Sequence, residues 1–388
     1  MAVPTAPSPP APSPAAPPPA TSSGPPGAEL VQLLTPEGER VSHPDYDVDL
    51  TDDEYRELYR DLVLVRRIDI EATALQRQGE LGLWPSSLGQ EGAQIGAAYA
   101  MRPQDYAFPT YREHGVTITR GVDPLRLLAM FRGTDTGSWD VLEHNTYMYS
   151  IIIGTQGVQA TGYGMGLERD GLVGSGDPER DAAVVCFFGD GATSQGDLNE
   201  GLVFASSYNA PVVFFCSNNQ WAISEPIERQ SRAPLYRRAA GFGIPGVRVD
   251  GNDALAVHAV TTAALERARS GSGPTFIEAY TYRMGAHTTS DDPTKYRLAD
   301  ELEHWRARDP LKRLRSYLER VGAADAAFFD GVDADADALA TQLRRDCLTL
   351  PVPTLADTFD WVYADKSPEL AEQLARHEAY AASFEEAR

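Results

Sequence analysis

The chain is 388 residues long, carries a formal net charge of −22 and is 42% hydrophobic. This length allows one large α/β domain or two smaller ones. The negative charge argues against binding to nucleic acid or to an anionic membrane surface, and no apolar run is long enough to span a bilayer. The cysteines are three, an odd number, and Cys186 and Cys216 lie within predicted core strands. We therefore expect buried thiols and a reducing, cytoplasmic location.

The first residues, 1 to about 27, are mostly Pro, Ala and Ser, a composition that predicts disorder with polyproline II character. They lack the apolar core of a signal peptide and the arginines of an organelle transit peptide, since the first arginine is Arg40. We expect residues 1–45 to form a disordered tail and linker, and residues 46–388 to form the folded domain with a helical C-terminal region. The tail is either a docking arm or dispensable, and we favour the second.

Two helices are predicted next along the chain. Thr51 and Glu54 have the spacing of a capping box. The helix that follows extends to about Gln78 and carries apolar residues on one face. A turn at residues 86–90 then leads into a second helix that ends near Met101.

Two segments between these helices and the central strands contain candidate binding residues. Arg112 lies in the segment 109–115, and a guanidinium can hold phosphate oxygens in a bidentate manner. A surface salt bridge is the structural alternative for Arg112. The run Ile151-Ile152-Ile153 has three consecutive β-branched residues and predicts a buried segment. A plain core strand explains these isoleucines equally well.

The central stretch predicts a βαβ unit. The apolar run Ala182–Phe188 is short enough to be a buried parallel strand. The turn Gly189-Asp190-Gly191 follows, and Asp197–Asn209 shows helical spacing. A second apolar run, Pro211–Cys216, stops before Asn218-Asn219. Both strands therefore end in polar residues at their carboxyl ends, where open α/β sheets hold ligands.

The residue types at these two strand ends suit a metal ion and a bulky anion. Asp190 offers a carboxylate oxygen and Asn219 a neutral amide oxygen, a set that suits Mg²⁺ bound also by a diphosphate and water. Gly189 and Gly191 let the backbone approach an anion closely, and amides at the helix start can face phosphate oxygens. In the structural alternative, Asp190 merely caps a helix.

Further along, residues 241–250 and 273–282 predict a third and a fourth strand, with a helix that starts near Asp253. A polar loop at residues 284–296 is too hydrophilic to be core, and such loops often carry function. Its His287 suits proton transfer and the orientation of a reactive group. A loop histidine bonded to Asp291 is the alternative. The remainder of the chain is predicted to be mainly helical.

Several motifs together resemble a known family. Gly189-Asp190-Gly191, then 26 residues, then Asn218-Asn219 is similar to the thiamine diphosphate motif of the transketolase-like superfamily. From about residue 52 to the C-terminus, the chain resembles the alpha chain of the decarboxylating component of 2-oxoacid dehydrogenase complexes. Further stretches agree in the family's order: Pro109–Gly115, Ile151–Gln156, Asn218–Ser224 and the segment from Thr281 to Arg297 that includes His287–Asp292.

The resemblance implies an α/β, thiamine diphosphate-binding fold with a parallel sheet flanked by helices, and it implies thiamine diphosphate and Mg²⁺ as cofactors. It assigns the metal to Asp190, Asn219 and the carbonyl of Trp221, and the active-site histidine to His287. It places the residue matching Ile153 under the bent cofactor. The implied cofactor-binding residues are Tyr111, Arg112, Ile151, Ile153, Gly189, Asp190, Gly191, Ala192, Asn219, Trp221, Ala222 and His287.

The resemblance also implies partners. In this family the glutamate that activates the aminopyrimidine lies on a second domain, so a separate beta subunit and an α2β2 heterotetramer are expected, with a lipoyl acyltransferase component as a further partner. The implied activity is oxidative decarboxylation of a 2-oxoacid with reductive acylation of the lipoyl group. Pyruvate is favoured, and a branched-chain 2-oxoacid such as 3-methyl-2-oxobutanoate is the alternative. A non-catalytic binding module of the same fold is the rival from another class.

Overall fold

A computed structural model describes residues 30–135, 139–360, 362–365 and 367–385. Its centre is a six-stranded sheet in the order β1-β7-β8-β4-β3-β2, and every pair of neighbouring strands is parallel. A short antiparallel pair, β5 and β6, lies outside this sheet. The strands are β1 (Leu30–Val31), β2 (Tyr106–Phe108), β3 (Val184–Gly189), β4 (Val212–Asn218), β5 (Trp221–Ala222), β6 (Glu225–Pro226), β7 (Gly246–Asp250) and β8 (Thr275–Tyr280).

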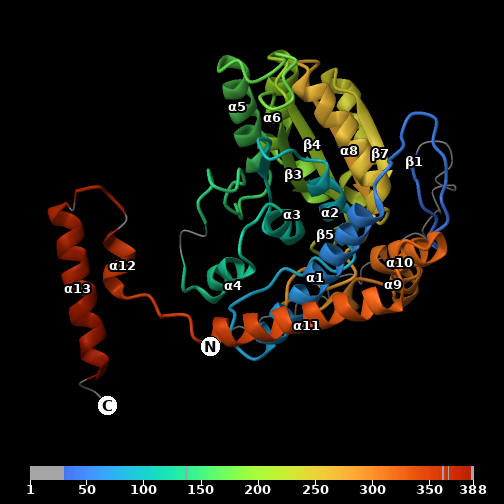
Figure 1. The fold of residues 1–388 in the computed structure, drawn as a ribbon. Coiled ribbons are helices and arrows are strands. Elements are labelled where there is room, and N and C mark those ends of the chain that lie inside the picture. The colour runs from blue at the N-terminus through green and yellow to red at the C-terminus, as the bar shows by residue number, and fades with distance from the viewer. Residues whose placement is uncertain (1–29, 136–138, 361, 366, 386–388) are drawn as a thin grey trace, which may run out of the picture.

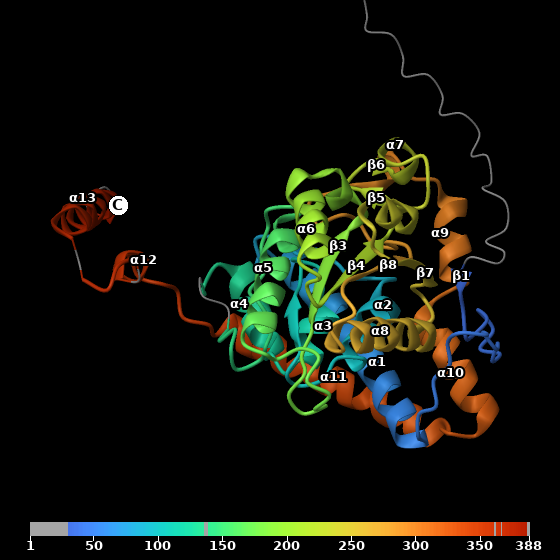
Figure 2. The ribbon, with the colours of Figure 1, turned by 90° about the horizontal axis from the view of Figure 1, so that it is seen from above.

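Helices flank this sheet on both sides (Figures 1 and 2). The α-helices are α1 (Asp52–Arg77), α2 (Glu91–Tyr99), α3 (His114–Thr119), α4 (Pro124–Arg132), α5 (Thr155–Arg169), α6 (Gly196–Ser207), α7 (Ile227–Gln230), α8 (Ala254–Arg269), α9 (Ala299–Arg306), α10 (Pro310–Val321), α11 (Ala326–Leu348), α12 (Leu355–Asp360) and α13 (Pro368–Glu385). The 3₁₀ helices are η1 (Asp190–Ser194), η2 (Leu235–Phe242) and η3 (Pro293–Lys295).

The alternation of side chains along the central strands divides the core in two. In β3, Val185 and Phe187 pack into one apolar cluster with residues of α1, α2 and α8. Val184, Cys186 and Phe188 point to the opposite face and pack with residues of α5, α6 and η2. Because both faces are covered, the strand is apolar throughout instead of alternating, as expected for a parallel sheet. The predicted α/β class and flanked parallel sheet are confirmed.

The predicted elements of the central unit are present with small shifts of their ends. Strand β3 starts two residues later than predicted, α6 spans nearly the predicted helix, and β4 continues to Asn218. The capping box before α1 is formed, because the Thr51 side chain accepts from the Glu54 N–H and Glu54 bonds back to the Thr51 backbone. The third predicted strand begins later, at Gly246, because the 3₁₀ helix η2 occupies the residues before Gly243.

The expected linker over residues 1–45 is wrong for its second part. Leu30 and Val31 form β1, the edge strand that pairs with β7. Leu33 and Leu34 are buried in the core cluster, and their backbone N–H groups donate to the Asp253 carboxylate. Burial of this short apolar run outweighs the ordering of the segment, so the folded chain includes residues 30–45. The earlier part of the expected tail, residues 1–29, lies outside the described residues.

The C-terminal part is helical, as predicted, and its first and last helices pack differently. Helices α10 and α11 pack along α1. Helices α12 and α13 contact each other and project away from the rest of the chain (Figures 1 and 2). In the described part of the chain, no helix is both long and apolar enough to cross a membrane.

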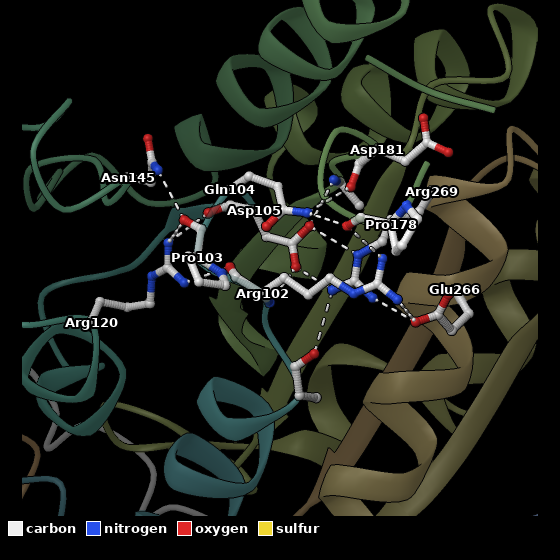
Figure 3. A network of polar contacts seen from close by, with 12 residues as sticks. Arg102, Pro103, Gln104, Asp105, Arg120, Asn145, Pro178, Asp181, Glu266 and Arg269 are labelled. Atoms are coloured by element: carbon white, nitrogen blue, oxygen red, sulfur yellow. Dashed lines mark hydrogen bonds and ion pairs between the residues drawn. The ribbon is translucent and has the colours of Figure 1, made fainter. Parts of the chain in front are cut away.

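A polar network ties the elements together at the amino ends of the strands (Figure 3). Asp105, directly before β2, accepts from the backbone N–H groups of Arg102 and Ala183 at 2.6 and 2.9 Å. It also pairs with Arg269 at the end of α8. Arg269 in turn pairs with Glu266. Asp105 and Arg269 are both buried, so this cluster joins β2, β3 and α8.

Candidate active site

A cavity of about 450 Å³ opens at the carboxyl ends of β3 and β4. The structure brings every residue that the sequence assigned to the site to the wall of this cavity. They come from the turn before α3, the segment before α5, the two strand ends, β5 and the loop after β8. The predicted residues that line it are Tyr111, Arg112, Ile151, Ile153, Gly189, Asp190, Gly191, Ala192, Asn219, Trp221, Ala222 and His287.

Asp190 is the first residue after β3 and is 1% exposed. Burial raises the pKa of its carboxyl to about 6, although a hydrogen bond from Gln230 acts in the opposite direction. Gln230 Nε2 donates to Asp190 Oδ2 at 3.0 Å. A carboxylate in this position therefore favours a cationic neighbour. Gly191 allows a close approach here, because a Cβ would lie 2.9 Å from the Cβ of Ala222.

Asn219 and Trp221 lie in a strained turn directly after β4. Gln220 and Ile223 have positive φ angles of 72° and 57°, which are uncommon for residues with a side chain. The Trp221 N–H donates to Asn219 Oδ1 at 3.3 Å, and the Trp221 carbonyl accepts from Arg283 Nη1 at 2.6 Å. The surrounding hydrogen bonds thus hold both predicted metal ligands at the cavity wall. A carbonyl oxygen has two lone pairs, so the bond from Arg283 leaves one lone pair.

Arg112 and His287 meet at the cavity wall. Arg112 Nη2 donates to the His287 carbonyl at 2.8 Å and lies 3.2 Å from His287 Nδ1. Since a guanidinium has no acceptor, Nδ1 accepts and the ring proton lies on Nε2. Burial and the charges of Arg112 and Arg283 lower the pKa of His287 to about 3, so the imidazole is neutral near pH 7. Asp291 bonds the backbone N–H of His287 instead of its ring.

Comparison with known proteins decides the family. The dehydrogenase E1 component family matches residues 59–341, well over half of the chain. The chain belongs to the dehydrogenase E1 component family.

Curated members of this E1 family agree with the match. The alpha subunit of 3-methyl-2-oxobutanoate dehydrogenase from Mycobacterium tuberculosis is 43% identical over 346 residues, which cover 89% of this chain and 92% of the relative. The pyruvate dehydrogenase E1 component alpha subunits from Staphylococcus epidermidis and Staphylococcus aureus are each 38% identical over 347 residues, covering 89% of this chain and 91% of the relative. The resemblance that the motifs indicated is therefore confirmed.

One prediction about the E1 chain's site is wrong. The isoleucines 151, 152 and 153 do not form a buried segment, because their side chains are 63%, 71% and 40% exposed. They lie in an irregular segment before α5, and Ile151 and Ile153 line the cavity. The three side chains are apolar, but nothing in the described part of the chain covers them. The burial that the sequence predicted is missing in the single chain.

Sequence reasoning also missed residues of the E1 chain that contact the predicted ones. Gln230 bonds Asp190 from 40 positions away, and no local pattern links the two. Glu113 is buried and accepts from the N–H and the hydroxyl of Thr110, which fixes the turn that holds Arg112. Arg283 lies within the segment from Thr281 to Arg297 that resembles the family, yet its bond to the Trp221 carbonyl depends on the fold. Only Glu113 had a usable signal, since a carboxylate adjacent to Arg112 in an aromatic segment is a candidate for burial.

Proposed function

We propose that this chain is the alpha subunit of a 2-oxoacid dehydrogenase complex, which decarboxylates pyruvate oxidatively and acylates the lipoyl group of the acyltransferase component. The observation that carries this proposal is the single cavity into which all the residues assigned by the motifs converge. Family membership supports thiamine diphosphate as the cofactor. A binding module without activity would not need a complete set of metal, diphosphate and imidazole groups, so we place that rival after both dehydrogenase candidates.

The residues present fit thiamine diphosphate and Mg²⁺. The carboxylate of Asp190, the amide oxygen of Asn219 and the carbonyl of Trp221 are the hard oxygen ligands that Mg²⁺ prefers. Among the described residues, buried polar atoms without a hydrogen-bond partner include Gln90 Nε2 and Arg283 Nε. Both residues line the cavity, and both atoms are donors, as oxygen atoms of a diphosphate require.

The chain's own residues would bind the cofactor and orient the reacting groups. When bound, the cofactor supplies the electron sink that decarboxylation of a 2-oxoacid requires. Arg112 would hold the diphosphate while its Nη2 keeps His287 at the cavity wall. His287, neutral and with its proton on Nε2, would orient the lipoyl group by donating a hydrogen bond from Nε2. Ile153, whose exposed side chain lines the cavity, would give the cofactor an apolar contact.

A beta subunit would cover the exposed apolar surface of this chain. In addition to the isoleucines at the cavity, Val203, Phe204 and Tyr208 of α6 and its end are exposed. Exposed apolar surface is typical of protein interfaces, and half of a cleft supplies neither the full orientation nor the second acid–base group. The isolated chain should therefore bind thiamine diphosphate weakly and turn over no 2-oxoacid. Dye reduction with pyruvate, Mg²⁺ and cofactor tests this, and robust turnover without any partner would refute the heterotetramer.

A branched-chain 2-oxoacid is the second candidate substrate. The relative from Mycobacterium tuberculosis, a 3-methyl-2-oxobutanoate dehydrogenase subunit, has the higher identity of those compared, 43% against 38%. The deciding experiment measures kcat/KM of the reconstituted alpha–beta pair for pyruvate and for 3-methyl-2-oxobutanoate. A higher value for pyruvate supports the first proposal, and a higher value for the branched substrate replaces pyruvate by it.

A further inference from the structure

Gln90 lies at the cavity wall and is not among the residues that the motifs assigned to the site. It is the last residue before α2 and is 1% exposed. Its backbone is fixed from several sides. The Gly89 N–H donates to Glu91 Oε2 at 2.9 Å, and Glu91 is itself buried and paired with Arg66. The Thr281 hydroxyl donates to the Gly89 carbonyl at 3.0 Å. This turn therefore holds the Gln90 side chain in one place.

The direction of the Gln90 amide follows from the donors around Asn219. The Trp221 backbone N–H can only donate, so the Asn219 atom that it meets at 3.3 Å is the oxygen. The NH₂ group of Asn219 therefore faces Gln90, and it donates to Gln90 Oε1 at 3.1 Å. It follows that the NH₂ group of Gln90 points away from Asn219. Amide directions are assigned from such networks.

The Gln90 NH₂ group therefore needs a partner other than Asn219. In the part of the chain that the structure describes, Gln90 Nε2 has no hydrogen-bond partner. A buried donor without an acceptor costs free energy, so a missing partner needs an explanation. Gln94, one turn further along α2, shows the ordinary case: its Nε2 donates to the Arg112 carbonyl at 2.9 Å and its Oε1 accepts from the Gly115 N–H at 2.8 Å. Gln90 differs in that it lines the cavity.

We propose that Gln90 is a further cofactor-binding residue. Its Nε2 donates to a diphosphate oxygen of the cofactor, and its Oε1 fixes the Asn219 amide so that the Asn219 oxygen is available to the metal. The ligand class follows from the chemistry at the wall, because an N–H donor beside carboxylate and amide oxygens suits an anion that is bound together with a cation. This inference rests on the function proposed above.

Two substitutions separate the two ends of the side chain. Gln90→Glu keeps an acceptor for Asn219 but replaces the donor by an acceptor that repels phosphate oxygens. Gln90→Leu removes both ends. If Gln90 contacts the diphosphate directly, both variants weaken binding of thiamine diphosphate at least about tenfold, since a lost hydrogen bond to a charged group is worth that much. Inorganic diphosphate should be weakened in parallel, because it carries the recognised group without the thiamine rings.

The measurement is calorimetry with saturating Mg²⁺ on the full chain copurified with its beta subunit, using thiamine diphosphate and inorganic diphosphate as separate probes. The unfolding midpoint without cofactor verifies folding. Gln159→Leu is the matched control. Gln159 Oε1 is likewise buried without a partner in the described chain, yet Gln159 does not line the cavity. The affinity of Gln159→Leu for both probes should therefore equal that of the wild type.

Each outcome decides. Weaker binding of both probes by both Gln90 variants supports the proposal. Wild-type affinity in Gln90→Glu overturns the direct contact, whatever Gln90→Leu does, because the glutamate retains the bond to Asn219. If the wild-type complex itself shows no Mg²⁺-dependent binding of thiamine diphosphate, the proposed function fails and the role of Gln90 fails with it. If the wild type binds and the variants match it, only the role of Gln90 fails.

Discussion

Two buried polar clusters lie at opposite edges of the same parallel sheet, and they differ in how their central carboxylates, Asp105 and Asp190, are paired. At the amino ends of the strands, Asp105 accepts from two backbone N–H groups and from two nitrogens of Arg269 (Figure 3). At the carboxyl ends, the hydrogen bond that Asp190 accepts from another side chain comes from Gln230. Burial raises the pKa of Asp190 to about 6, whereas Asp105 has its positive partner within the chain.

This difference indicates what each cluster does. Within the described residues, Gln90 Nε2, Gln156 Oε1 and Arg283 Nε are buried without a partner, and all three residues line the cavity. Most buried polar groups in proteins are paired, so an unpaired one needs an explanation. For these three groups at the cavity, the explanation that we favour is a ligand that supplies the missing partners. The Asp105 cluster therefore stabilises the chain, and the Asp190 cluster is prepared for binding at some cost in stability.

The largest expected effect is on stability, at the amino-end cluster. Arg269→Met leaves the buried Asp105 charge without its partner and should lower the free energy of unfolding by roughly 3–5 kcal/mol. Urea unfolding of the complex measures it. The matched control is Arg102→Met, which keeps the backbone N–H on Asp105 and removes a partly exposed pair with Glu266, worth at most about 1 kcal/mol. Equal losses in the two variants would contradict the assignment, as would a change of cofactor affinity in Arg269→Met.

At the carboxyl-end cluster, substitution should instead affect binding. Asp190→Ala removes the carboxylate from the proposed metal ligands and should weaken Mg²⁺-dependent binding of thiamine diphosphate about 10²–10³-fold. Calorimetry at saturating Mg²⁺ tests this, and unchanged affinity would remove Asp190 from the site. Asp190→Asn sharpens the comparison with Asp105: without cofactor it should stabilise the chain by about 1 kcal/mol, because burial disfavours the charge. A loss of stability in Asp190→Asn would mean that the Asp190 carboxylate stabilises the fold, as the Asp105 carboxylate does.

A smaller, selective effect is expected for His287. It belongs to a loop at the cavity and not to the core, so His287→Ala should spare folding and cofactor binding. Acyl transfer to the lipoyl group should fall about a hundredfold, more than decarboxylation does, because the Nε2–H group of the ring orients the lipoyl acceptor. The two half-reactions are measured separately, by dye reduction and by lipoyl acylation. His304→Ala is the control, because His304 is an exposed residue of α9. Wild-type rates in both half-reactions would make His287 an ordinary loop residue.

The smallest effect concerns pH. The folded pKa of His287 is lowered to about 3, and that of the buried His114 likewise to about 3 through burial. Between about pH 3 and the unfolded value near 6.5, the unfolded chain therefore binds more protons than the folded chain, and stability falls as the pH is lowered through this window. His287→Asn should flatten that dependence by less than about 1.4 kcal/mol per pH unit, since the ring is partly exposed. Unfolding at about pH 5 and about pH 7 measures the slope; an unchanged slope would contradict the lowered pKa.

Local patterns were sufficient for the elements that frame the site. The apolar runs of β3 and β4, the Gly-Asp-Gly turn and the helical spacing of α6 are all properties of neighbouring residues, so the βαβ unit follows from hydrophobic periodicity. The capping box of α1 is equally local. The motif residues could be assigned to one site because carboxyl ends of parallel strands meet at one edge of the sheet. The roles assigned to them by resemblance remain predictions.

What the sequence by itself determined is thus the order of elements, the α/β class and the residue types at the strand ends. The tertiary structure decided which distant residues meet: Arg112 with His287 across 175 positions, Asn219 with Gln90 across 129, and Asp190 with Gln230 across 40. It also decided that the segment 30–31 forms an edge strand and that the isoleucines 151–153 stay exposed. The sequence pattern shows which residues are apolar and how they are spaced. Whether a residue is buried, and which group it bonds, depends on the segment that packs against it. That segment can be far away in the sequence, because the order of the strands and the packing of the helices decide which segments meet.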